Sequence, residues 1–392
     1  MPRRLLVATT IPETAWTIMR GQLQHLQRSG FDVVLVSSPG RRLEQTGQRE
    51  GIDVRAVPMR RELSPMADLI ALWRLFRLLR AEPVDISYVC TPKAALLAGL
   101  AAAAVGTRTR IYALWGLRLE TEHGWRRAIL WVSEWISIHT AHHVIAVSPS
   151  LLDRARQLRL LGKRRGVVLA RGASNGVDVD ALVPTCPHRS DGAHLRDELG
   201  IPEGDFVFGF VGRMTVDKGI SELLGAFAVV QDQHPDVWLV IAGAEELAGL
   251  PEPIRRQLTQ LRNVRLTGWI EDAAPVYQAI DCLVLPSYRE GFPNVPLEAA
   301  AAGRPVITTS VTGAVDSIIP NQTGLLVKPR SASDLAAAMK HLAGHREQAR
   351  QMGEAGRRFV VQHYTNQIVW RALTDFLDAT GAQDASHNRR HR

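Results

Sequence analysis

One pattern, a short apolar run followed by a helical stretch, repeats along the chain and starts again after an interruption. The first series begins at Arg4–Thr9 (RLLVAT) and ends at Val167–Leu169. The second begins at Phe206–Val211 (FVFGFV) and ends at Val306–Thr309. Strands that alternate with helices pair in parallel, because each helical crossover returns the chain to the same edge of the sheet. The chain is therefore predicted to be an α/β protein with two doubly wound, Rossmann-like sheets.

The length of 392 residues suits two domains. Proline residues in Pro184–Pro187 (PTCP) predict the linker between them, and Thr10–Glu13 (TIPE) predicts a capping box at the start of the first helix. We expect an N-terminal domain at residues 1–185, a C-terminal domain at 186–370, and a helix end with a loose basic tail at 371–392. The other expected strands are Asp32–Ser37, Val54–Pro58, Asp85–Val89, Arg110–Ala113, His143–Ser148, Val237–Ala242, Val264–Thr267 and Cys282–Pro286.

Cysteine usage and the apolar runs exclude several classes of protein. Cys90, Cys186 and Cys282 are far apart and lack CxxC spacing, so neither a disulfide framework nor a zinc site is predicted. The N-terminus has no apolar stretch typical of a signal peptide. The longest apolar run, Ala94–Val105, is too short to cross a bilayer and predicts a buried helix. A cytoplasmic protein is expected.

The positive charge is confined to one half of the chain. Met1–Thr185 has 26 Lys and Arg against 15 Asp and Glu, a balance of +11, whereas the whole chain carries +8. A basic N-terminal half indicates an acidic partner such as pyrophosphate, anionic lipid or nucleic acid. Because no nucleic-acid-binding motif accompanies the charge, no nucleic-acid partner is expected.

Two cations follow the first strand of the second series. Arg213 and Lys218 lie on the connection between Phe206–Val211 and the next helix. Fixed cations beside a helix N-terminus can stabilise a diphosphate as a leaving group without a metal ion. An ordinary solvated loop would carry such charges equally well, so this pair alone leaves both interpretations open.

Two glutamates flank a turn rich in glycine and proline. Glu290 and Glu298 lie within Leu285–Ala299 (LPSYREGFPNVPLEA), after a buried strand. We expect both carboxylates on the cleft side, with Glu298 in the first turn of a helix, where it can accept two ribose hydroxyls. Backbone amides of such a turn bind phosphate and sugar oxygens. A single glutamate there could instead interact only with the helix dipole, but two with this spacing favour a ligand site.

These residues resemble the donor-site signature of the retaining glycosyltransferases of family four, which have the two-domain GT-B fold with the domains facing across a cleft. The resemblance covers nearly the whole chain. Four further motifs occur in the order that the family shows: Asn175–Asp178 (NGVD), Asn263–Trp269 (NVRLTGW), Gly303–Ile307 (GRPVI) and Asn321–Val327 (NQTGLLV).

The resemblance implies roles for individual residues. Arg213, Lys218 and Glu290 are expected to be catalytic, with Glu290 orienting the hydroxyls of the donor sugar. Retention is implied too, through a leaving β-phosphate that takes the proton of the incoming hydroxyl. No cofactor and no metal requirement are expected. The donor-binding residues are expected to be Gly212, Gly243, Trp269, Gly291, Phe292, Asn294, Val295 and Glu298.

Three segments of the first half resemble the capsular and exopolysaccharide transferases of this family: Val57–Asp68 (VPMRRELSPMAD), Thr91–Leu97 (TPKAALL) and Arg110–Glu120. Those enzymes typically extend sugars linked to polyprenyl diphosphate. Arg60, Arg61 and Lys93 are then expected to meet the acceptor diphosphate, although each could be a plain surface charge. Trp115 stands where the family often has a histidine, and it is the expected acceptor-side residue there, with His123 or His25 as alternatives. The family's glycine-rich turn after the first strand is missing, which leaves contacts with the acceptor sugar open.

The segment Leu69–Arg80 (LIALWRLFRLLR) predicts an amphipathic helix with Arg74, Arg77 and Arg80 on one face. Such a helix suits an anionic inner membrane, and Trp125, Trp131 and Trp135 extend the patch. An ordinary helix that buries one face against its sheet is the default in this fold and the favoured alternative.

We therefore expect an enzyme that moves a hexose or N-acetylhexosamine from a nucleotide diphosphate sugar, UDP-sugars being favoured, to a polyprenyl-diphosphate-linked acceptor. Assembly of capsule, exopolysaccharide or O-antigen would require such a step at the cytoplasmic face of the plasma membrane. Three alternatives remain: transfer to a soluble acceptor, a sugar-nucleotide 2-epimerase, and a non-catalytic subunit that binds sugar nucleotides.

Overall fold

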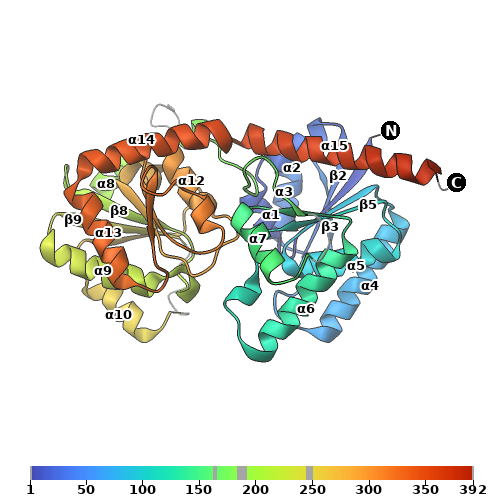
Figure 1. Cartoon of the computed structure of the whole chain (residues 1–392), viewed down its shortest axis with the longest axis horizontal. Coiled ribbons are helices and arrows are strands. Elements are labelled where there is room, and N and C mark those ends of the chain that lie inside the picture. The colour runs from blue at the N-terminus through green and yellow to red at the C-terminus, as the bar shows by residue number, and fades with distance from the viewer. Residues whose placement is uncertain (1, 162–165, 183–191, 244–249, 391–392) are drawn as a thin grey trace. The chain divides into compact units, whose positions relative to one another are not determined.

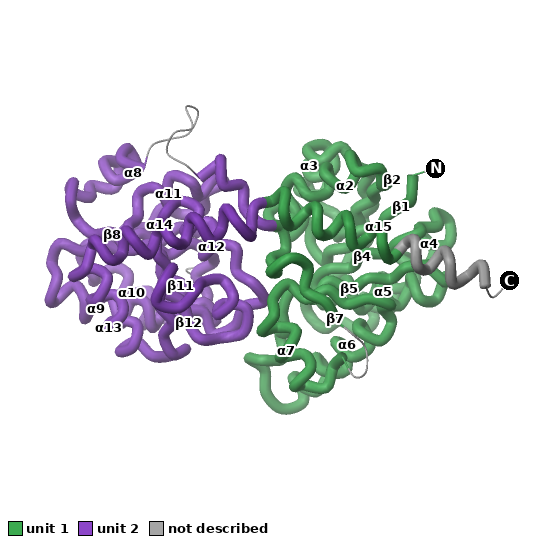
Figure 2. The backbone as a smooth tube through the Cα atoms, turned by 45° about the horizontal axis from the view of Figure 1, so that its top comes forward, with its two compact units in different colours: residues 1–175, 366–392 green, residues 176–365 purple. Residues whose placement is uncertain are grey.

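Two compact units make up the protein, and each contains one fully parallel sheet (Figure 1). The computed structural model describes residues 2–161, 166–182, 192–243 and 250–390, with side chains given as far as Thr380. Unit 1 consists of residues 1–175 and 366–392, and unit 2 of residues 176–365 (Figure 2). The predicted α/β class with two Rossmann-like sheets is confirmed.

The sheet of unit 1 has seven strands in the order β3-β2-β1-β4-β5-β6-β7. The inner strands are buried along most of their length, as expected for a parallel sheet that helices cover on both faces, whereas the edge strand β3 is partly exposed. The strands are β1 (Arg3–Ala8), β2 (Phe31–Ser37), β3 (Asp53–Ala56), β4 (Ile86–Cys90), β5 (Thr109–Leu114), β6 (His143–Ala146) and β7 (Gly166–Val167).

The helices of unit 1 form two layers. On one face the core joins Leu5 and Val7 of β1 to apolar side chains of α1 (Pro12–Ile18), α2 (Gln22–Arg28), α3 (Arg41–Glu50) and α15 (Asn366–Arg390). Right-handed crossovers place α4 (Pro65–Ala81), α5 (Pro92–Ala104) and α6 (Gly124–Thr140) on the other face. The unit also contains η1 (Arg118–Glu120) and α7 (Pro149–Gln157).

The alanine-rich run predicted to be a buried helix is α5. It packs against α4 on one side and α6 on the other, and it contacts β4 and β5 beneath it (Figure 1). Side chains as small as Ala94, Ala98 and Ala101 let all of these neighbours approach closely, and each is fully buried. The crowded position explains why this helix has almost no polar face.

The sheet of unit 2 has six strands in the order β10-β9-β8-β11-β12-β13, around a core rich in phenylalanine and leucine. The strands are β8 (Phe206–Val211), β9 (Val237–Ala242), β10 (Val264–Gly268), β11 (Cys282–Leu285), β12 (Val306–Thr309) and β13 (Gly324–Val327). The helices are η2 (Asp180–Leu182), α8 (Gly192–Glu198), η3 (Val216–Lys218), α9 (Ile220–Gln233), α10 (Glu252–Gln260), α11 (Ala274–Ala279), α12 (Asn294–Ala301), η5 (Ala314–Asp316), α13 (Ala332–Gly344) and α14 (Arg346–His363).

The division into units differs from the one expected from the sequence. It falls after residues 175 and 365, whereas a boundary at 185 and a second domain reaching 370 were expected. The last helix belongs to unit 1 because Leu373 and Leu377 complete its core, and Trp370 Nε1 donates to Asn175 Oδ1 at 2.7 Å. The backbone of the tail expected to be loose is helical as far as Arg390. The predicted linker at 184–187 lies outside the described residues.

Two local predictions were wrong. Thr10 does not cap the first helix, which begins at Pro12 without a side-chain cap. Its hydroxyl instead lies 2.8 Å from the hydroxyl of Thr91 and accepts a hydrogen bond from the Ala94 amide at 3.2 Å, so a long-range partner replaces the local one. The sixth strand of unit 2, β13, was also missed, because four residues after a turn carry little periodicity.

Candidate active site

The predicted donor residues of unit 2 follow the carboxyl ends of its strands. Gly212 and Arg213 follow β8, Gly243 follows β9 and Trp269 follows β10. The turn that holds Glu290 and Gly291 follows β11. Because parallel strands end at one edge of the sheet, these segments gather there, at the place where open α/β sheets bind ligands.

Glycines allow these connections to touch one another. Gly243 has a φ of +156°, and a Cβ atom there would lie 1.8 Å from the carbonyl oxygen of Gly212. Gly219 has a φ of +73°, and a Cβ atom there would lie 2.1 Å from the carbonyl oxygen of Pro286. No other residue fits at either position without moving the backbone. The close approach of these backbones fixes the edge on which the charged side chains stand.

Lys218 and Glu290 form an ion pair at this edge. Lys218 Nζ donates to Glu290 Oε1 at 2.5 Å, and both side chains are largely buried. Arg213, three residues before η3, is exposed to solvent. A lysine ammonium has three protons to donate, so Lys218 can hold Glu290 and still donate to phosphate oxygens. The structure thus brings together two of the three predicted catalytic residues and leaves the third accessible.

The loop after β11 is bound to the loop after β8 by contacts that the sequence did not reveal. The Tyr288 amide donates to the Asp217 carbonyl at 2.9 Å, and Arg289 lies 3.7 Å from the Asp217 carboxylate. Tyr288 Oη donates to Glu222 Oε2 at 2.5 Å, and the Arg330 guanidinium lies 4.1 Å from the Tyr288 ring centre. These contacts keep the two loops together, so that Glu290 and Lys218 stay within reach of each other.

The residues around Asp217 determine its charge. Burial by itself would raise the pKa of its carboxyl group, but contact with Thr215 and the charges of Lys218, Arg289 and Arg213 lower that pKa overall. Asp217 therefore stays ionised beside the cations. The edge carries a compact arrangement of alternating charges instead of a uniformly positive surface.

Glu298 has an unexpected partner in Tyr277 of α11. Tyr277 is fully buried, and its hydroxyl donates to Glu298 Oε2 at 2.5 Å. Desolvation raises the pKa of Glu298, the hydrogen bond from Tyr277 lowers it, and Asp272 adds to the rise. Glu298 lies in the second turn of α12, one turn later than expected, because the helix does not begin until Asn294.

The residues between the two glutamates differ in their environment. Phe292 points into the core, where its ring centre lies 5.5 Å from that of Tyr364, so only its backbone faces the turn. Asn294 opens α12, and its Oδ1 is buried without a hydrogen-bond partner in the described part of the chain. Val295 is half-buried, whereas Trp269 is 57% exposed. A buried acceptor without a partner is rare in proteins and is typical of a ligand site.

The predicted acceptor residues of unit 1 also follow the carboxyl ends of strands. Arg60 and Arg61 are exposed in the connection from β3 to α4. Lys93 opens α5 and is engaged in the fold: its Nζ lies 2.5 Å from Asp68 Oδ2 and 2.9 Å from the Glu62 carbonyl oxygen. Trp115 follows β5 and packs against the core beneath it. A ligand that contacts the Lys93 ammonium therefore also approaches the Asp68 carboxylate paired with it. Arg60 and Arg61 have no described ion pairs.

Thr91 occupies a strained position at the same edge. It is β-branched, yet its φ is +66°, and it stands between β4 and the first residue of α5. Its hydroxyl accepts a hydrogen bond from the Thr10 amide at 3.1 Å, which holds this conformation in place. Backbone strain of this kind is concentrated at functional sites, and no local sequence pattern indicates it.

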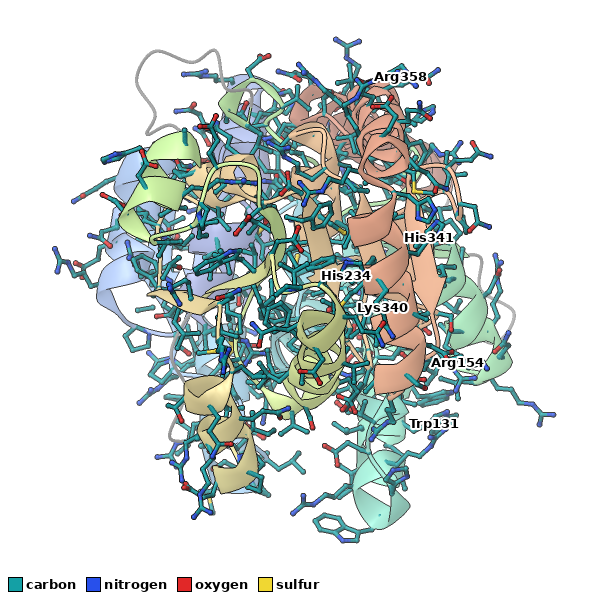
Figure 3. All side chains as sticks on the ribbon, turned by 90° about the vertical axis from the view of Figure 1, so that its left-hand side faces the viewer. Trp131, Arg154, His234, Lys340, His341 and Arg358 are labelled. Carbon is teal, nitrogen blue, oxygen red and sulfur yellow. The ribbon has the colours of Figure 1, made fainter. Side chains whose placement is uncertain are left out.

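Trp131 does not extend the tryptophan patch that the sequence suggested. Its Nε1 donates to the carbonyl oxygen of Leu158 at 3.0 Å, so it fastens α6 to the end of α7, the helix that carries Arg154 (Figure 3). Trp125 and Trp135, on the same helix, are exposed.

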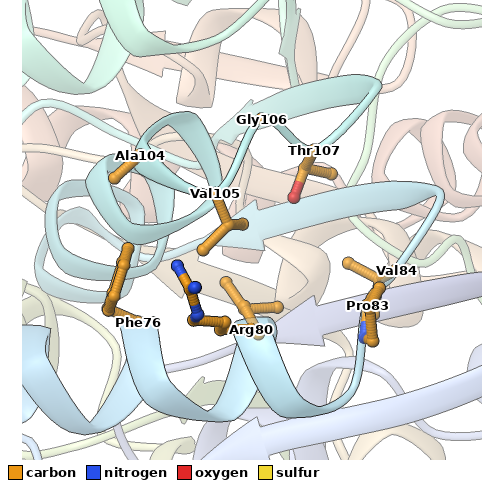
Figure 4. A pocket seen from close by; sticks show the side chains of 9 residues that line it. Phe76, Arg80, Pro83, Val84, Ala104, Val105, Gly106 and Thr107 are labelled. Carbon is orange, nitrogen blue, oxygen red and sulfur yellow. The ribbon is translucent and has the colours of Figure 1, made fainter.

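Two cavities lie away from these residues, one in each unit. Each is at the edge of the sheet where the strands begin, opposite to the carboxyl edge that holds the candidate site. One, of about 280 Å³, lies between the ends of α4 and α5 and is lined by Phe76, Arg80, Val84 and Thr107 among others (Figure 4). The other, of about 300 Å³, is lined by Phe206, Pro305 and arginines that include Arg196 and Arg304. Because these linings come just before strands begin, neither cavity belongs to the candidate site.

The described residues contain no cluster of three or more histidine, cysteine, aspartate or glutamate side chains that could hold a metal ion. An Asp-x-Asp triplet, Asp178–Asp180, stands at the start of η2, where Asp178 Oδ1 accepts a hydrogen bond from the Ala181 amide. Cys90 and Cys282 are buried free thiols, and Cys186 lies outside the described residues. Within the described ranges no helix is long and apolar enough to cross a membrane.

Comparison with known proteins assigns both halves of the chain to one class of enzyme. Residues 14–172 match the model of the glycosyl transferase 4-like domain, and residues 192–359 match that of the glycosyl transferases group 1. The chain belongs to this glycosyltransferase family, which has the GT-B fold, and it is an enzyme.

Among its relatives is the capsular polysaccharide biosynthesis glycosyltransferase CapM of Staphylococcus aureus. It is 33% identical over 358 residues, which cover 91% of this chain and 92% of CapM. A D-inositol 3-phosphate glycosyltransferase of Corynebacterium jeikeium is 32% identical over 262 residues, which cover 57% of this chain and 62% of that protein.

Solved structures agree on the fold. A sucrose-phosphate synthase of Thermosynechococcus elongatus superposes with a TM-score of 0.78 at 19% identity, covering 97% of this chain and 100% of that one. Anabaena HepE in complex with UDP-glucose superposes with a TM-score of 0.78 at 20% identity, covering 96% and 100%.

Proposed function

We propose that this glycosyltransferase moves a hexose or N-acetylhexosamine from a nucleotide diphosphate sugar, UDP-sugars being favoured, to a hydroxyl of a polyprenyl-diphosphate-linked acceptor. The step would serve the assembly of a capsule, exopolysaccharide or O-antigen at the cytoplasmic face of the membrane. The observation that carries the proposal is the Lys218–Glu290 pair at the carboxyl edge of the unit 2 sheet, beside the exposed Arg213. The 33% identity to CapM over nearly the whole chain supports the capsule-type acceptor.

Each residue of the site binds a different part of the donor. Glu298 accepts hydrogen bonds from ribose hydroxyls, while backbone amides of the turn at Gly291 bind oxygens of the diphosphate and the sugar. Glu290 orients the sugar hydroxyls, and its ion pair with Lys218 fixes the rotamers of both side chains. Arg213 and Lys218 stabilise the negative charge that develops on the leaving β-phosphate.

Transfer with retention then needs no protein nucleophile. The bond from the anomeric carbon to the β-phosphate oxygen breaks, and the acceptor oxygen forms a bond to the same face of that carbon. The proton of the acceptor hydroxyl passes to the departing phosphate oxygen, so that a nucleoside diphosphate leaves. Charge stabilisation of a leaving group by fixed cations contributes on the order of 10²- to 10³-fold in rate per donor.

A soluble acceptor is the second candidate. The D-inositol 3-phosphate glycosyltransferases among the relatives favour it, because their identity to this chain, 32% over 262 residues in one case, is close to that of CapM. That match covers 57% of the chain, against 91% for CapM, so the lipid-linked acceptor remains the first choice.

The test is a transfer assay with purified protein. UDP-, GDP- and ADP-sugars are each offered with a polyprenyl-diphosphate-linked sugar or with inositol 3-phosphate. Nucleotide release, product mass and the anomeric configuration of the product by NMR are followed. A lipid product one sugar heavier, with the donor's configuration kept, supports the proposal. A product only on inositol 3-phosphate supports the soluble acceptor, and inversion contradicts the proposed mechanism.

Control variants distinguish the loss of a catalytic group from a general effect of substitution on the protein. Lys218→Ala and Glu290→Ala are expected to abolish most of the transfer. Lys340→Ala makes the same change at a half-buried lysine near the end of α13, where Lys340 Nζ contacts only Gln233 Oε1 at 3.2 Å among its described hydrogen bonds (Figure 3). Its activity is expected to equal that of the unaltered protein.

A further inference from the structure

The exposed large apolar side chains of unit 1 are concentrated on two helices. Nine such side chains are found in its described part: eight lie on α4 or α6, and the ninth, Leu63, lies just before α4 begins. Met66 is 71% exposed and Trp73 56% on α4, while Trp125 is 66% exposed on α6. Single exposed apolar residues are normal on protein surfaces, but a concentration of this kind marks an interaction site. The complete set is Leu63, Met66, Leu69, Ile70, Trp73, Trp125, Ile129, Val132 and Trp135.

On each helix these side chains form a stripe opposite the buried one. Positions 66, 69, 70 and 73 of α4 recur at intervals of three and four residues, and so do positions 125, 129 and 132 of α6. The buried face of α4 is made by Ala71, Leu75 and Leu79. The buried face of α6 is made by Glu134, Ser137 and Ile138. On both helices apolar side chains thus lie on the exposed face, and α4 has two apolar faces, so the favoured alternative of an ordinary half-buried helix does not account for them.

The two stripes belong to one face of unit 1. Both α4 and α6 pack against α5, on the side of the sheet opposite to α1, α2 and α15 (Figure 1 and Figure 2). Each helix starts at the carboxyl edge of the sheet, and apart from Trp135 the exposed apolar residues lie no further than the middle of the helix. We call this surface, formed by the nine side chains together with the arginines of α4 and α6, the α4/α6 surface. It borders the edge that carries Arg60 and Arg61.

The charges on the α4/α6 surface have one sign. Arg74, Arg77 and Arg80 of α4 are exposed, and α6 adds Arg126 and Arg127. The guanidinium of Arg77 lies 4.8 Å from the Trp73 ring centre, and that of Arg126 lies 5.5 Å from the Trp125 ring centre.

The acidic residues of the two helices do not offset this charge. Asp68 of α4 is bound to Lys93, and Glu134 of α6 is buried against Tyr112. Glu62 and Glu122 lie before the two helices begin, and Glu82, which directly follows α4, is paired with Arg4 and Arg55.

We propose that the α4/α6 surface binds an anionic phospholipid bilayer. Tryptophan and aliphatic side chains interleaved with arginine suit the headgroup region, where rings enter the interface and guanidinium groups meet phosphates. A second copy of the chain is a poor occupant, because a self-complementary interface would bring five arginines against five arginines. Docking would bring the edge at Arg60 and Arg61 to a lipid-linked acceptor. Only this reason for docking rests on the proposed function.

The experiment measures lipid binding without turnover. Full-length protein is sedimented with vesicles of phosphatidylcholine alone and with vesicles that also contain phosphatidylglycerol, at low and high salt. The unaltered protein is expected to bind the anionic vesicles and to be partly released by salt. Arg74→Gln, Arg77→Gln and Arg126→Gln combined are expected to weaken binding on the order of 100-fold, about fivefold for each charge.

Variants that remove tryptophan rings test the apolar part of the α4/α6 surface. Trp73→Ser combined with Trp125→Ser is expected to weaken binding to anionic vesicles about tenfold or more, because the interfacial rings are lost. The matched controls Val229→Ser and Arg358→Gln change exposed side chains of unit 2 and are expected to bind as the unaltered protein does. Donor binding by calorimetry, measured for every variant, reports whether unit 2 is intact.

Several outcomes would overturn the inference. They are no binding to anionic vesicles, binding that the surface variants leave unchanged, and a dimer in solution that Trp73→Ser dissolves. Vesicle binding that depends on the α4/α6 surface, together with failure of sugar transfer to any lipid, would leave this inference standing and refute the proposed function instead.

Discussion

Lys218 and Glu290, which are 72 residues apart in the sequence, meet at 2.5 Å through Nζ and Oε1. Each neutralises the other in a largely buried place, so removing one leaves an uncompensated charge. The pair therefore contributes to the stability of unit 2 as well as to donor binding.

The first prediction concerns this coupling. Lys218→Met is expected to lower the free energy of unfolding by about 1–3 kcal/mol, and adding Glu290→Gln is expected to restore most of that loss. Both single variants lose transfer activity on the order of 100-fold, and the double variant does not regain it. Denaturant unfolding and steady-state kinetics check this, with Lys340→Met as the control. Additive losses of stability would contradict the coupling.

The second prediction concerns Tyr277. Tyr277→Phe removes the hydrogen bond that favours the ionised form of Glu298, so the pKa of Glu298 rises further. The KM for the donor is expected to rise about tenfold, with kcat nearly unchanged, since a hydrogen bond to a charged group contributes about 1.5 kcal/mol. As the pH falls, the donor affinity of the variant should decline at a higher pH than that of the unaltered enzyme.

A matched control for Tyr277 lies in unit 1. Tyr112 Oη donates to Glu134 Oε2 at 2.8 Å, in a buried pair of the same chemistry, and Tyr112→Phe should leave the donor KM unchanged. A donor without ribose hydroxyls should be insensitive to Tyr277→Phe. Equal effects of Tyr277→Phe on donors with and without these hydroxyls would show that Tyr277 does not act through Glu298.

The third prediction concerns the pH dependence of stability. Burial raises the pKa of Glu134 from 4.5 to about 7, against the opposing effect of the hydrogen bond from Tyr112. Between these values the folded state keeps a proton that the unfolded state releases, so the free energy of unfolding falls as the pH rises. Above pH 7 the loss is complete, at about 3 kcal/mol.

The variant Glu134→Gln removes this titration. Its free energy of unfolding, relative to that of the unaltered protein, is expected to increase by about 3 kcal/mol from pH 4.5 to pH values above 7. Denaturant unfolding across this range measures the difference. Curves that stay parallel over the whole window would show that Glu134 titrates normally in the folded protein.

The fourth prediction concerns Gly243. A Cβ atom there would lie 1.8 Å from the Gly212 carbonyl oxygen, so Gly243→Ala must displace the loop that leads to Arg213. The expected loss is about 3 kcal/mol or more of stability, together with donor binding. Gly303→Ala is the control, because Gly303 has a φ of +75° but nothing within 4 Å, and about 1 kcal/mol is expected there. Equal losses in the two variants would mean that the loop contact is unimportant.

The sequence predicted the elements whose pattern is local. Val237–Ala242 and Val306–Thr309 were expected as strands with the bounds that the structure has, because apolar runs of parallel strands need no knowledge of their neighbours. Thr10 was misjudged because the partner of its hydroxyl, Thr91, is 81 residues away. Charge types at the site could be predicted, but the partners of Lys93 and Glu298 depend on which helices become neighbours.

The placement of α15 has a consequence for biosynthesis. Unit 1 starts first on the ribosome, yet its core lacks Leu373 and Leu377 until the last helix has been made. Unit 2 is encoded without interruption by residues 176–365 and can close its core earlier. The N-terminal half must therefore wait, with part of its apolar face uncovered, for a segment that emerges after the C-terminal sheet is complete. This delay makes unit 1 the part of the nascent chain that most needs protection from aggregation.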